Sequence, residues 1–306
     1  MATPFVPKEA LKFDGALLQE LQGDVSDTIA RDLLREDLPS IAPSSVIHDN
    51  GCGYGACTMA IMNSNPPENI KIHATDVNPI FIAQLQAKLD ENPSWPVKIE
   101  NMDACDLTFP DNTFNLSPGG TGIVAVWKEM PWHVALENAH HKTRGADEPM
   151  APFLSKSWYK KERLQQVTTE AGWKDVKYVE KAAWLNLGAD LKRWATIAWT
   201  FLVTPVGGWQ QRDEDRWDEA IDAIATESSQ SEWHKVEDGI HKIRMMALDD
   251  KNDTHYFLDI NPDEAERLQL GELVIGDWMG GKRVWAPLDL SKPGLKFLDS
   301  ATASSN

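Results

Sequence analysis

The chain has 306 residues, a length that fits one large domain or one domain with an addition. Apolar residues make up 42% of the chain, enough to build a core, and the formal net charge is -17. Because this acidity repels phosphate groups, we expect neither a nucleic-acid partner nor binding to an anionic membrane surface.

The hydropathy of the sequence indicates neither a membrane span nor a signal peptide. No apolar run approaches the roughly 18 residues that cross a bilayer, and the start MATPFVPKEALKFD lacks a charged region followed by an apolar one. The three cysteines, Cys52, Cys57 and Cys105, are too few and too irregularly spaced for a disulfide framework or a zinc site. We therefore expect a reduced, cytoplasmic protein that holds no metal.

The first hundred residues alternate between helical and extended patterns. In chain order they predict helix at 8–39, strand at 46–48, helix at 56–62, strand at 70–75, helix at 80–89 and strand at 97–101. This alternation is typical of βαβ units, whose right-handed crossovers place helices on both faces of a parallel sheet. The predicted fold class is therefore α/β, with a doubly wound, mostly parallel sheet.

After residue 127 the pattern becomes mainly helical and rich in aromatic residues. In this part the sequence predicts strands at 176–187 and 240–248, and helices within 128–172, 189–200 and 212–236. We expect these helices to form a cap on the sheet, mainly from residues 128–172 and 189–236.

The sharpest local signal is the glycine-rich turn HDNGCGYGA at residues 48–56. Gly51, Gly53 and Gly55 lie between a predicted strand and a predicted helix. Glycine tolerates a positive φ and lets the backbone approach a ligand closely, and the helix start behind the turn offers free N–H groups. Asp76, at the end of the next strand, is placed to bind the hydroxyls of a ribose.

Two kinds of ligand fit this turn. Gly51, Gly53 and Ala56 satisfy the G-x-G-x-x-G/A pattern of dinucleotide sites, which favours a nicotinamide-dependent oxidoreductase. However, Asp49 stands where dinucleotide folds usually keep an apolar residue, and a carboxylate there suits a cationic ligand better than a pyrophosphate. The absence of a Tyr-x-x-x-Lys pair after the sheet also counts against the oxidoreductase.

Three segments together resemble a known family. DNGCGYG, then ATDVNP, then MDACDLTFPDNTF are similar in order and spacing to class I S-adenosylmethionine-dependent methyltransferases. The resemblance covers roughly residues 8–248. The later segments PGGTGIVAVW and WKDVKYVEKAAW resemble the same family, especially fungal small-molecule methyltransferases of secondary metabolism. The resemblance to this family implies a Rossmann-like sheet. It also implies methyl transfer from S-adenosyl-L-methionine to a nitrogen, oxygen or sulfur atom of a small-molecule acceptor.

The resemblance also implies roles for nine residues. The methionine part of the cofactor would be surrounded by Asp49, Gly51, Gly53 and Gly55. Asp76 would bind the ribose hydroxyls and Val77 would pack on the adenine. Asp103 would accept a hydrogen bond from the adenine amino group, with Met102 and Ala104 beside it. The alternatives are an empty structural turn for the glycines, a helix N-cap for Asp76 and an ordinary loop or cap residue for Asp103.

The catalytic residue is not identified by any pattern. The sulfonium methyl is already activated, so a base is needed only where the acceptor must first lose a proton. His133 in EMPWH is a candidate base; the alternative is that it, His140 and His141 are surface or capping residues. Five tryptophans have two possible roles: they line an aromatic pocket for the acceptor, or they pack the helical cap on the sheet. They are Trp127, Trp132, Trp158, Trp184 and Trp199.

The stretch FNLSPGGTGIVAVW, residues 114–127, is shorter than the resemblance requires. In the family a fourth strand and a helix precede the PGG turn and the fifth strand. Here residues 115–117 resemble the start of that fourth strand and Pro118 the turn before the fifth, so one strand–helix unit is missing after residue 117. The sheet would close if residues 122–127 took the place beside the first strand. This deletion predicts a methyltransferase of impaired stability and activity, or a cofactor-binding regulator without turnover.

The last part of the chain follows a polar linker near residue 249. We expect one cofactor-binding domain over residues 1–248 and an extension over 249–306. The segments THYFLDINPDEAERLQ, GGKRVWAPLDL and LKFLDSATA resemble the start of a second methyltransferase domain, with Asp299 at the place of Asp49. The alternative is a C-terminal extension without a fixed place, as is common at chain ends.

Overall fold

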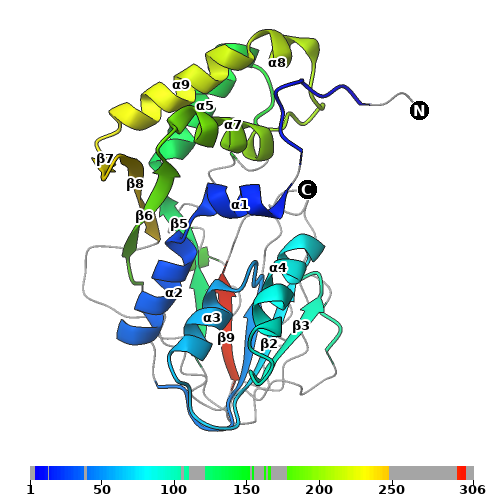
Figure 1. Cartoon of the computed structure of the whole chain (residues 1–306), viewed down its shortest axis with the longest axis vertical. Coiled ribbons are helices and arrows are strands. Elements are labelled where there is room, and N and C mark those ends of the chain that lie inside the picture. The colour runs from blue at the N-terminus through cyan, green and yellow to red at the C-terminus, as the bar shows by residue number, and fades with distance from the viewer. Residues whose placement is uncertain are drawn as a thin grey trace.

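The computed structural model describes residues 4–12, 14–37, 40–104, 107–109, 121–151, 154, 162, 165–166, 178–247 and 295–300. These residues form a five-stranded sheet, a four-stranded sheet and the helices that pack on them. Figure 1 shows the five-stranded sheet in the lower half of the molecule and the helices α5, α7, α8 and α9 in the upper half.

The five-stranded sheet is parallel and has the order β3-β2-β1-β9-β4. Its strands are β1 (Val46–Asn50), β2 (Lys71–Asp76), β3 (Val97–Asn101), β4 (Thr121–Ala125) and β9 (Leu295–Ser300). The helices α3 (Ala56–Asn63) and α4 (Pro79–Asp90) connect β1 to β2 and β2 to β3. This parallel βαβαβ unit confirms the predicted Rossmann-like α/β fold.

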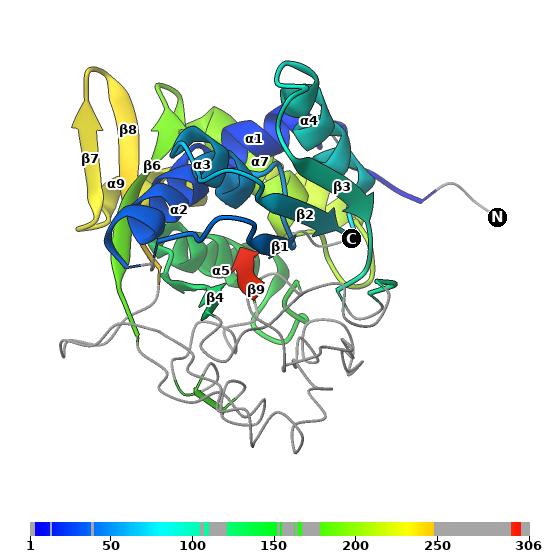
Figure 2. The same ribbon diagram turned by 90° about the horizontal axis from the view of Figure 1, so that it is seen from below.

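One face of this sheet carries the apolar side chains that hold the crossover helices. Ile47 and Ile72 lie in register on neighbouring strands and pack in one cluster with α3 and α2 (Val25–Glu36). Ala74 packs with Leu85 of α4 in a second cluster. The view in Figure 2 shows α2, α3 and α4 on the same side of the strands. Side chains of a strand alternate between the two faces of the sheet, so burial of one face explains why every second residue in this part of β1 and β2 is apolar or buried.

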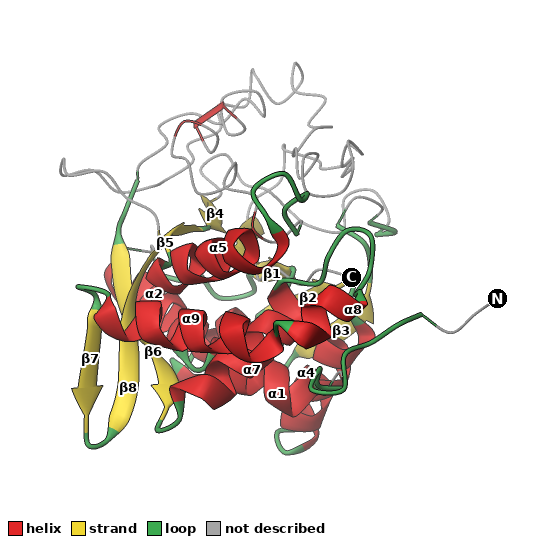
Figure 3. Cartoon of the chain, turned by 90° about the horizontal axis from the view of Figure 1, so that it is seen from above, coloured by secondary structure: helices red, strands yellow, loops and turns green. Residues whose placement is uncertain are grey.

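A second sheet and the remaining helices form the other half of the molecule. The antiparallel sheet contains β5 (Trp127–Glu129), β6 (Lys181–Gly188), β7 (His234–Glu237) and β8 (Ile240–Ala247). The helices are α1 (Gly15–Gln22), α5 (Pro131–Arg144), α7 (Leu191–Leu202), α8 (Gln211–Asp215) and α9 (Trp217–Gln230). Helix α9 contacts both α5 and α7, and Figure 3 shows the three helices side by side. Of these helices, α5, α7, α8 and α9 lie within the residues predicted to form the helical cap.

Several helices begin where a short polar side chain can cap them. The side chain of Asn78 accepts a hydrogen bond from the N–H of Ile80 at 3.0 Å, with Pro79 in the first turn of α4. Asp190 accepts from the N–H of Lys192 in the same way at the start of α7. Such caps satisfy N–H groups that the helix leaves free, so the sequence fixes these starts locally.

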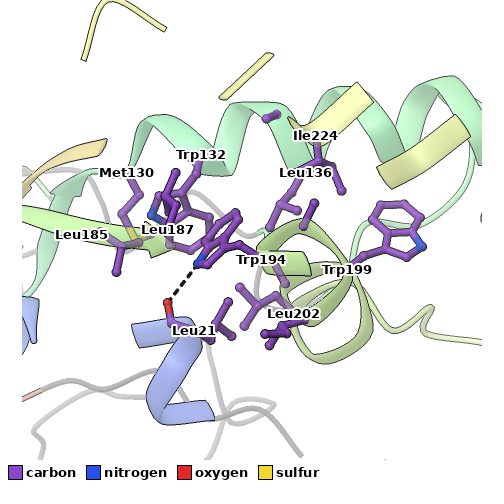
Figure 4. Close-up of a cluster of buried hydrophobic side chains, with 14 of the residues drawn as sticks. Leu21, Met130, Trp132, Leu136, Leu185, Leu187, Trp194, Trp199, Leu202 and Ile224 are labelled. Carbon is purple, nitrogen blue, oxygen red and sulfur yellow. Dashed lines mark hydrogen bonds between the residues drawn. The ribbon is translucent and has the colours of Figure 1, made fainter. Parts of the chain in front are cut away.

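The core of the cap is built on buried tryptophans (Figure 4). Trp194 is 2% exposed, lies edge-on to Trp132 with ring centroids 5.7 Å apart, and donates its Nε1–H to the carbonyl of Leu21 at 3.4 Å. Trp199 is also buried in this cluster. Trp132 and Trp199 therefore pack the core of the cap, as the alternative to an acceptor pocket predicted. Trp127 is partly buried against the same cluster, Trp184 is 40% exposed, and Trp158 lies outside the described residues.

Three predicted elements differ from the structure. The helical region 8–39 is two helices, because Gly23 with a φ of +56° ends α1. The helical region 212–236 includes strand residues, since β7 begins at His234 and pairs with β8 across a tight turn. The single strand expected at 122–127 is divided between two sheets: β4 pairs with β9, and β5 pairs with β8.

The place beside β1 is not taken by residues 122–127. β9 pairs with β1 on one side and with β4 on the other, so the expectation that 122–127 close the sheet directly on the first strand is wrong. Part of the predicted extension, residues 295–300, thus lies in the same sheet as β1. The proposed deletion after residue 117 falls on residues 110–120, which are outside the described residues. In the described ranges no helix has the length and apolar character to span a bilayer.

We predict that Trp194→Ala lowers the free energy of unfolding by about 3 to 5 kcal/mol, because it leaves a large cavity between α7, α1 and α5. Trp184→Ala is the matched control on the half-exposed side of β6, and it should cost less than about 1 kcal/mol. Urea unfolding followed by circular dichroism measures both. Equal losses for the two variants would contradict the packing role of Trp194.

Candidate functional site

The glycine turn between β1 and α3 has a backbone that requires glycine. Gly51, Gly53 and Gly55 have φ values of +67°, +54° and +92°, in the region that side-chain-bearing residues rarely adopt. Gly55 is also the N-cap of α3, and a Cβ added there would lie 2.4 Å from Cδ1 of Leu85 in α4. The turn is therefore fixed by backbone conformation at three positions and by close packing at Gly55.

Asp49 joins β1 to the start of α3. Its side chain is fully buried, and its Oδ2 accepts hydrogen bonds from the N–H of Thr58 at 3.1 Å and from the Thr58 hydroxyl at 2.6 Å. Thr58 is the third residue of α3, whose N-cap Gly55 has no side chain to satisfy that N–H. Asp49 therefore caps the helix from the neighbouring strand.

The electrostatic environment of Asp49 is unusual for an aspartate. Burial raises its pKa to about 7, although the hydrogen bonds from Thr58 act in the opposite direction, and the nearby carboxylate of Asp76 raises it further. Its second oxygen, Oδ1, is buried and accepts no hydrogen bond from the part of the chain that the structure describes. A buried polar atom in this state calls for an explanation. A cationic group bound at Oδ1 would satisfy it and favour the ionised carboxylate.

Asp76, at the carboxyl end of β2, is held by backbone N–H groups on both oxygens. Oδ2 accepts from Gly53 at 2.9 Å and Oδ1 accepts from Asn78 at 2.7 Å. Burial raises its pKa, and these N–H groups oppose that rise. The bond to Gly53 fixes the position of the glycine turn over β2. The capping alternative does not hold for Asp76, because the N-cap of α4 is Asn78.

The end of β3 is tied to the end of β2 by two further contacts. The N–H of Met102 donates to the carbonyl of Asp76 at 3.0 Å, and Nδ2 of Asn101 donates to the same carbonyl at 2.7 Å. Asn101 Nδ2 also donates to the carbonyl of Val77 at 2.9 Å, which leaves the Val77 side chain on the surface with 48% exposure. Val77 thus offers an exposed apolar surface next to Asp76.

The predicted site residues gather at one edge of the sheet. Because β1, β2 and β3 are parallel, their carboxyl ends lie at the same edge, where the glycine turn, Asp76 and Met102 are linked by hydrogen bonds. Asp103 and Ala104 follow Met102 directly and are half-buried. Their roles in binding a ligand stay predictions.

The opposite face of β1 and β2 is polar rather than apolar. Nε2 of His48 lies 2.9 Å from Oγ1 of Thr75, which donates its hydrogen to Oδ1 of Asn50 at 3.1 Å. Since the Thr75 hydroxyl has one hydrogen, His48 must donate from Nε2. Burial lowers the pKa of His48 to about 3, so it stays neutral near pH 7. This network orients Asn50 beside the glycine turn, and the ring of Phe109 packs edge-on against His48 with centroids 5.2 Å apart.

Sequence reasoning missed two residues that position this edge. Thr58 binds Asp49, and Asn101 binds the carbonyls after β2. The signals for them are a hydroxyl in the first turn of the helix behind a glycine turn and an amide at the end of the third strand. Neither signal identifies the group that the side chain binds, because Asp49 lies 9 residues from Thr58 and Asp76 lies 25 residues from Asn101.

The candidate base His133 lies in the first turn of α5 and is buried in the cap. Its Nδ1 is 3.9 Å from Oε2 of Glu137, one helical turn further on. His140 is buried as well, whereas His141 is exposed. The surface alternative therefore fits His141 alone, and a catalytic role for His133 stays a prediction.

We predict that Gly55→Ala destabilises the protein more than Gly239→Ala, the matched control in the β7–β8 turn. Both residues have a positive φ, which costs a side-chain-bearing residue about 1 kcal/mol, but nothing lies within 4 Å of a Cβ added at Gly239. At Gly55 the Cβ must displace Leu85, which is fully buried, and this adds about 1 to 3 kcal/mol. Thermal unfolding compares them; equal shifts would rule out the close packing with α4.

Residues 47–143 match the family model of a methyltransferase domain. No curated protein matches the chain. Among solved structures, similarity is found to a protein of Bacillus halodurans C-125 assigned as a methyltransferase, with 13% identity and a TM-score of 0.44 over 72% of this chain and 95% of that one.

Two further solved structures show a similarity to this chain. Phosphoethanolamine N-methyltransferase 2 of Haemonchus contortus, in complex with phosphomonomethylethanolamine and S-adenosylhomocysteine, has 12% identity and a TM-score of 0.38 over 76% of this chain and 56% of that one. The [4+2]-cyclase SpnF has 17% identity and a TM-score of 0.34 over 72% and 79%. Similarity this low carries no argument about activity. The matched segment 47–143 is just under a third of the chain, and it contains the whole candidate site from Asp49 to Ala104.

Proposed function

We propose that the chain binds S-adenosyl-L-methionine at the carboxyl ends of β1, β2 and β3 and transfers its methyl group to a nitrogen, oxygen or sulfur atom of a small-molecule acceptor. The observation that carries the proposal is the buried carboxylate of Asp49, whose Oδ1 accepts no hydrogen bond from the described residues. The match of residues 47–143 to a methyltransferase domain supports it.

The residues present fit this cofactor. Its methionine part carries positive charge, and an ionised Asp49 beside the glycine turn would attract a cation, whereas it would repel the pyrophosphate of a dinucleotide. The positive φ of Gly51 and Gly53 removes side chains from the turn, so a ligand can approach the backbone. Asp49 would then hold the methionine part, together with Gly51, Gly53 and Gly55.

The nucleoside part fits the next two strands. Asp76 is already oriented by Gly53 and Asn78, and a carboxylate has about four acceptor sites, so it keeps capacity for a ribose hydroxyl. Val77 presents exposed apolar surface for the adenine ring. Met102, Asp103 and Ala104 follow the neighbouring strand β3 and would line the adenine.

When bound, the cofactor supplies an activated methyl group. The contribution of the chain is then to hold donor and acceptor in position, which can account for a large part of a barrier. A base is required only for an acceptor that must lose a proton, and His133 is the candidate for that step. The resemblance of PGGTGIVAVW to fungal enzymes of secondary metabolism supports a small-molecule acceptor, and the few, irregularly spaced cysteines support a cytoplasmic protein.

Two alternatives make different predictions. A nicotinamide-dependent oxidoreductase would bind NADH and not S-adenosyl-L-methionine. A regulator that keeps the fold without turnover would bind S-adenosyl-L-methionine and give no product in a screen of acceptors, and the short stretch at 114–127 supports impaired turnover of this kind. Calorimetry with both cofactors, followed by product detection by mass spectrometry, separates the three. Binding of NADH alone would overturn the proposal.

We predict that Asp76→Ala weakens binding of S-adenosyl-L-methionine by roughly 1 to 3 kcal/mol, or about 5- to 150-fold in Kd, because a charge-assisted contact to the ribose is lost. Asp90→Ala is the control: Asp90 is exposed at the end of α4 and accepts a hydrogen bond from Gln86. Its Kd should equal that of the unchanged protein. If Asp76→Ala binds as tightly as the control, Asp76 is not part of the site.

We predict that binding of S-adenosyl-L-methionine weakens as the pH falls below about 7. The pKa of Asp49 in the free protein is about 7, and only the ionised carboxylate attracts a cation, so binding at lower pH must remove a proton. The loss approaches tenfold in Kd for each pH unit below the pKa. Asp49→Asn should bind weakly and lose this component of the pH dependence.

Calorimetry in buffers of different ionisation enthalpy measures the proton directly. Near pH 6.5 the unchanged protein should release more protons on binding than Asp49→Asn does. The same proton release from both proteins would show that Asp49 does not titrate with binding.

A further inference from the structure

The strand β9 occupies an internal position in the parallel sheet, between β1 and β4, although it lies more than 160 residues after β4 in the sequence. Leu295 lies in register with Val46 and Asp299 with Asn50 on β1. On its other side Lys296 lies in register with Thr121 and Ser300 with Ala125 on β4. The strands β1 and β4 are therefore joined to each other through β9 (Figure 2).

The burial of β1 depends on a neighbour at this position. Ile47, His48, Asp49 and Asn50 are all nearly inaccessible to solvent. A strand at the edge of a sheet would leave its backbone N–H and C=O groups on that side unpaired, which is costly where they are buried. In the described residues β9 is the strand that pairs with this side of β1.

Among the described elements that neighbour β1 to β3 in the sequence, none pairs with this side of β1. A parallel strand beside β1 needs a crossover of roughly a dozen residues or more after β3, and the strand that follows β3 among the described elements, β4, pairs with β9 rather than with β1. After β4 the chain leaves the sheet, because β5 pairs antiparallel with β8. The place beside β1 is thus open to a segment from elsewhere.

We propose that residues 295–300 act as a complementing strand, which inserts between β1 and β4 of the same chain and keeps the carboxyl end of β1 in place. Insertion of an extended segment into a gap in a sheet gains main-chain hydrogen bonds on both sides. The helix α3 contacts β9, so the strand also supports the helix that Asp49 caps. This inference concerns the sheet and does not depend on the identity of the ligand or on methyl transfer.

The test is amide hydrogen exchange of the full chain, read by mass spectrometry without any ligand. Residues 295–300 should exchange at least 100-fold more slowly than an unstructured peptide of the same sequence, because β9 is paired on both sides. Protection should not change over a 100-fold dilution, since the strand comes from the same chain. Exchange at the rate of the free peptide would overturn the proposal, and protection lost on dilution would assign the strand to a second copy and overturn it as well.

A variant shows whether β1 depends on the strand. Phe297→Pro removes one N–H from the middle of β9 and should speed exchange at residues 46–50 and 121–125 by at least tenfold. Residues 191–202 of α7, in the cap, should keep their protection and so show that the protein has not simply unfolded. Ser305→Pro, beyond β9, is the control and should change none of these rates. Unchanged protection at 46–50 in Phe297→Pro would overturn the dependence.

Discussion

The burial of Asp49 at the end of β1 is the constraint on which the candidate site depends. Its Oδ2 binds both the N–H and the hydroxyl of Thr58, so the start of α3 is held on the strand that precedes the turn. With both ends of the turn fixed, the chain between them must use the positive φ values of its glycines. The burial that makes this contact strong also raises the pKa of Asp49, and the ionised form therefore benefits from a nearby cation.

Hydrogen bonds extend this order from the first strand to the third. Gly53 on the turn binds Asp76, and Met102 and Asn101 bind the carbonyl of Asp76 from β3. Four residues at or just after the carboxyl ends of three strands are thus fixed relative to one another before any ligand binds. Preorganisation of this kind reduces the ordering that binding would otherwise require. The exposed side chain of Val77 is the part of this edge that is left free to meet an apolar ring.

The sheet reaches its full width through a segment remote in sequence. β9 lies between β1 and β4, so the strand that carries Asp49 is internal rather than at an edge. The cap has a core of buried tryptophans and aliphatic residues, which Tyr54 of the glycine turn and Phe81 of α4 also join. β5 belongs to this half because it pairs with β8. The bend at Val126, which is buried, is where the chain passes from the parallel sheet to the antiparallel one.

The sequence by itself determined the elements whose signals are local. Strand 97–101 was predicted with its observed bounds, and the helices behind β1 and β2 within one residue at each end, because apolar spacing, glycines and prolines act on neighbouring residues. It also placed Asp49, the glycines and Asp76 at one edge, since parallel strands share their carboxyl ends. Only the tertiary structure decided that 122–127 divides between two sheets, that Thr58 binds Asp49, and that 295–300 fills the place beside β1. These outcomes rest on pairing between distant residues, and no local periodicity specifies the partner of a strand or of a buried carboxylate.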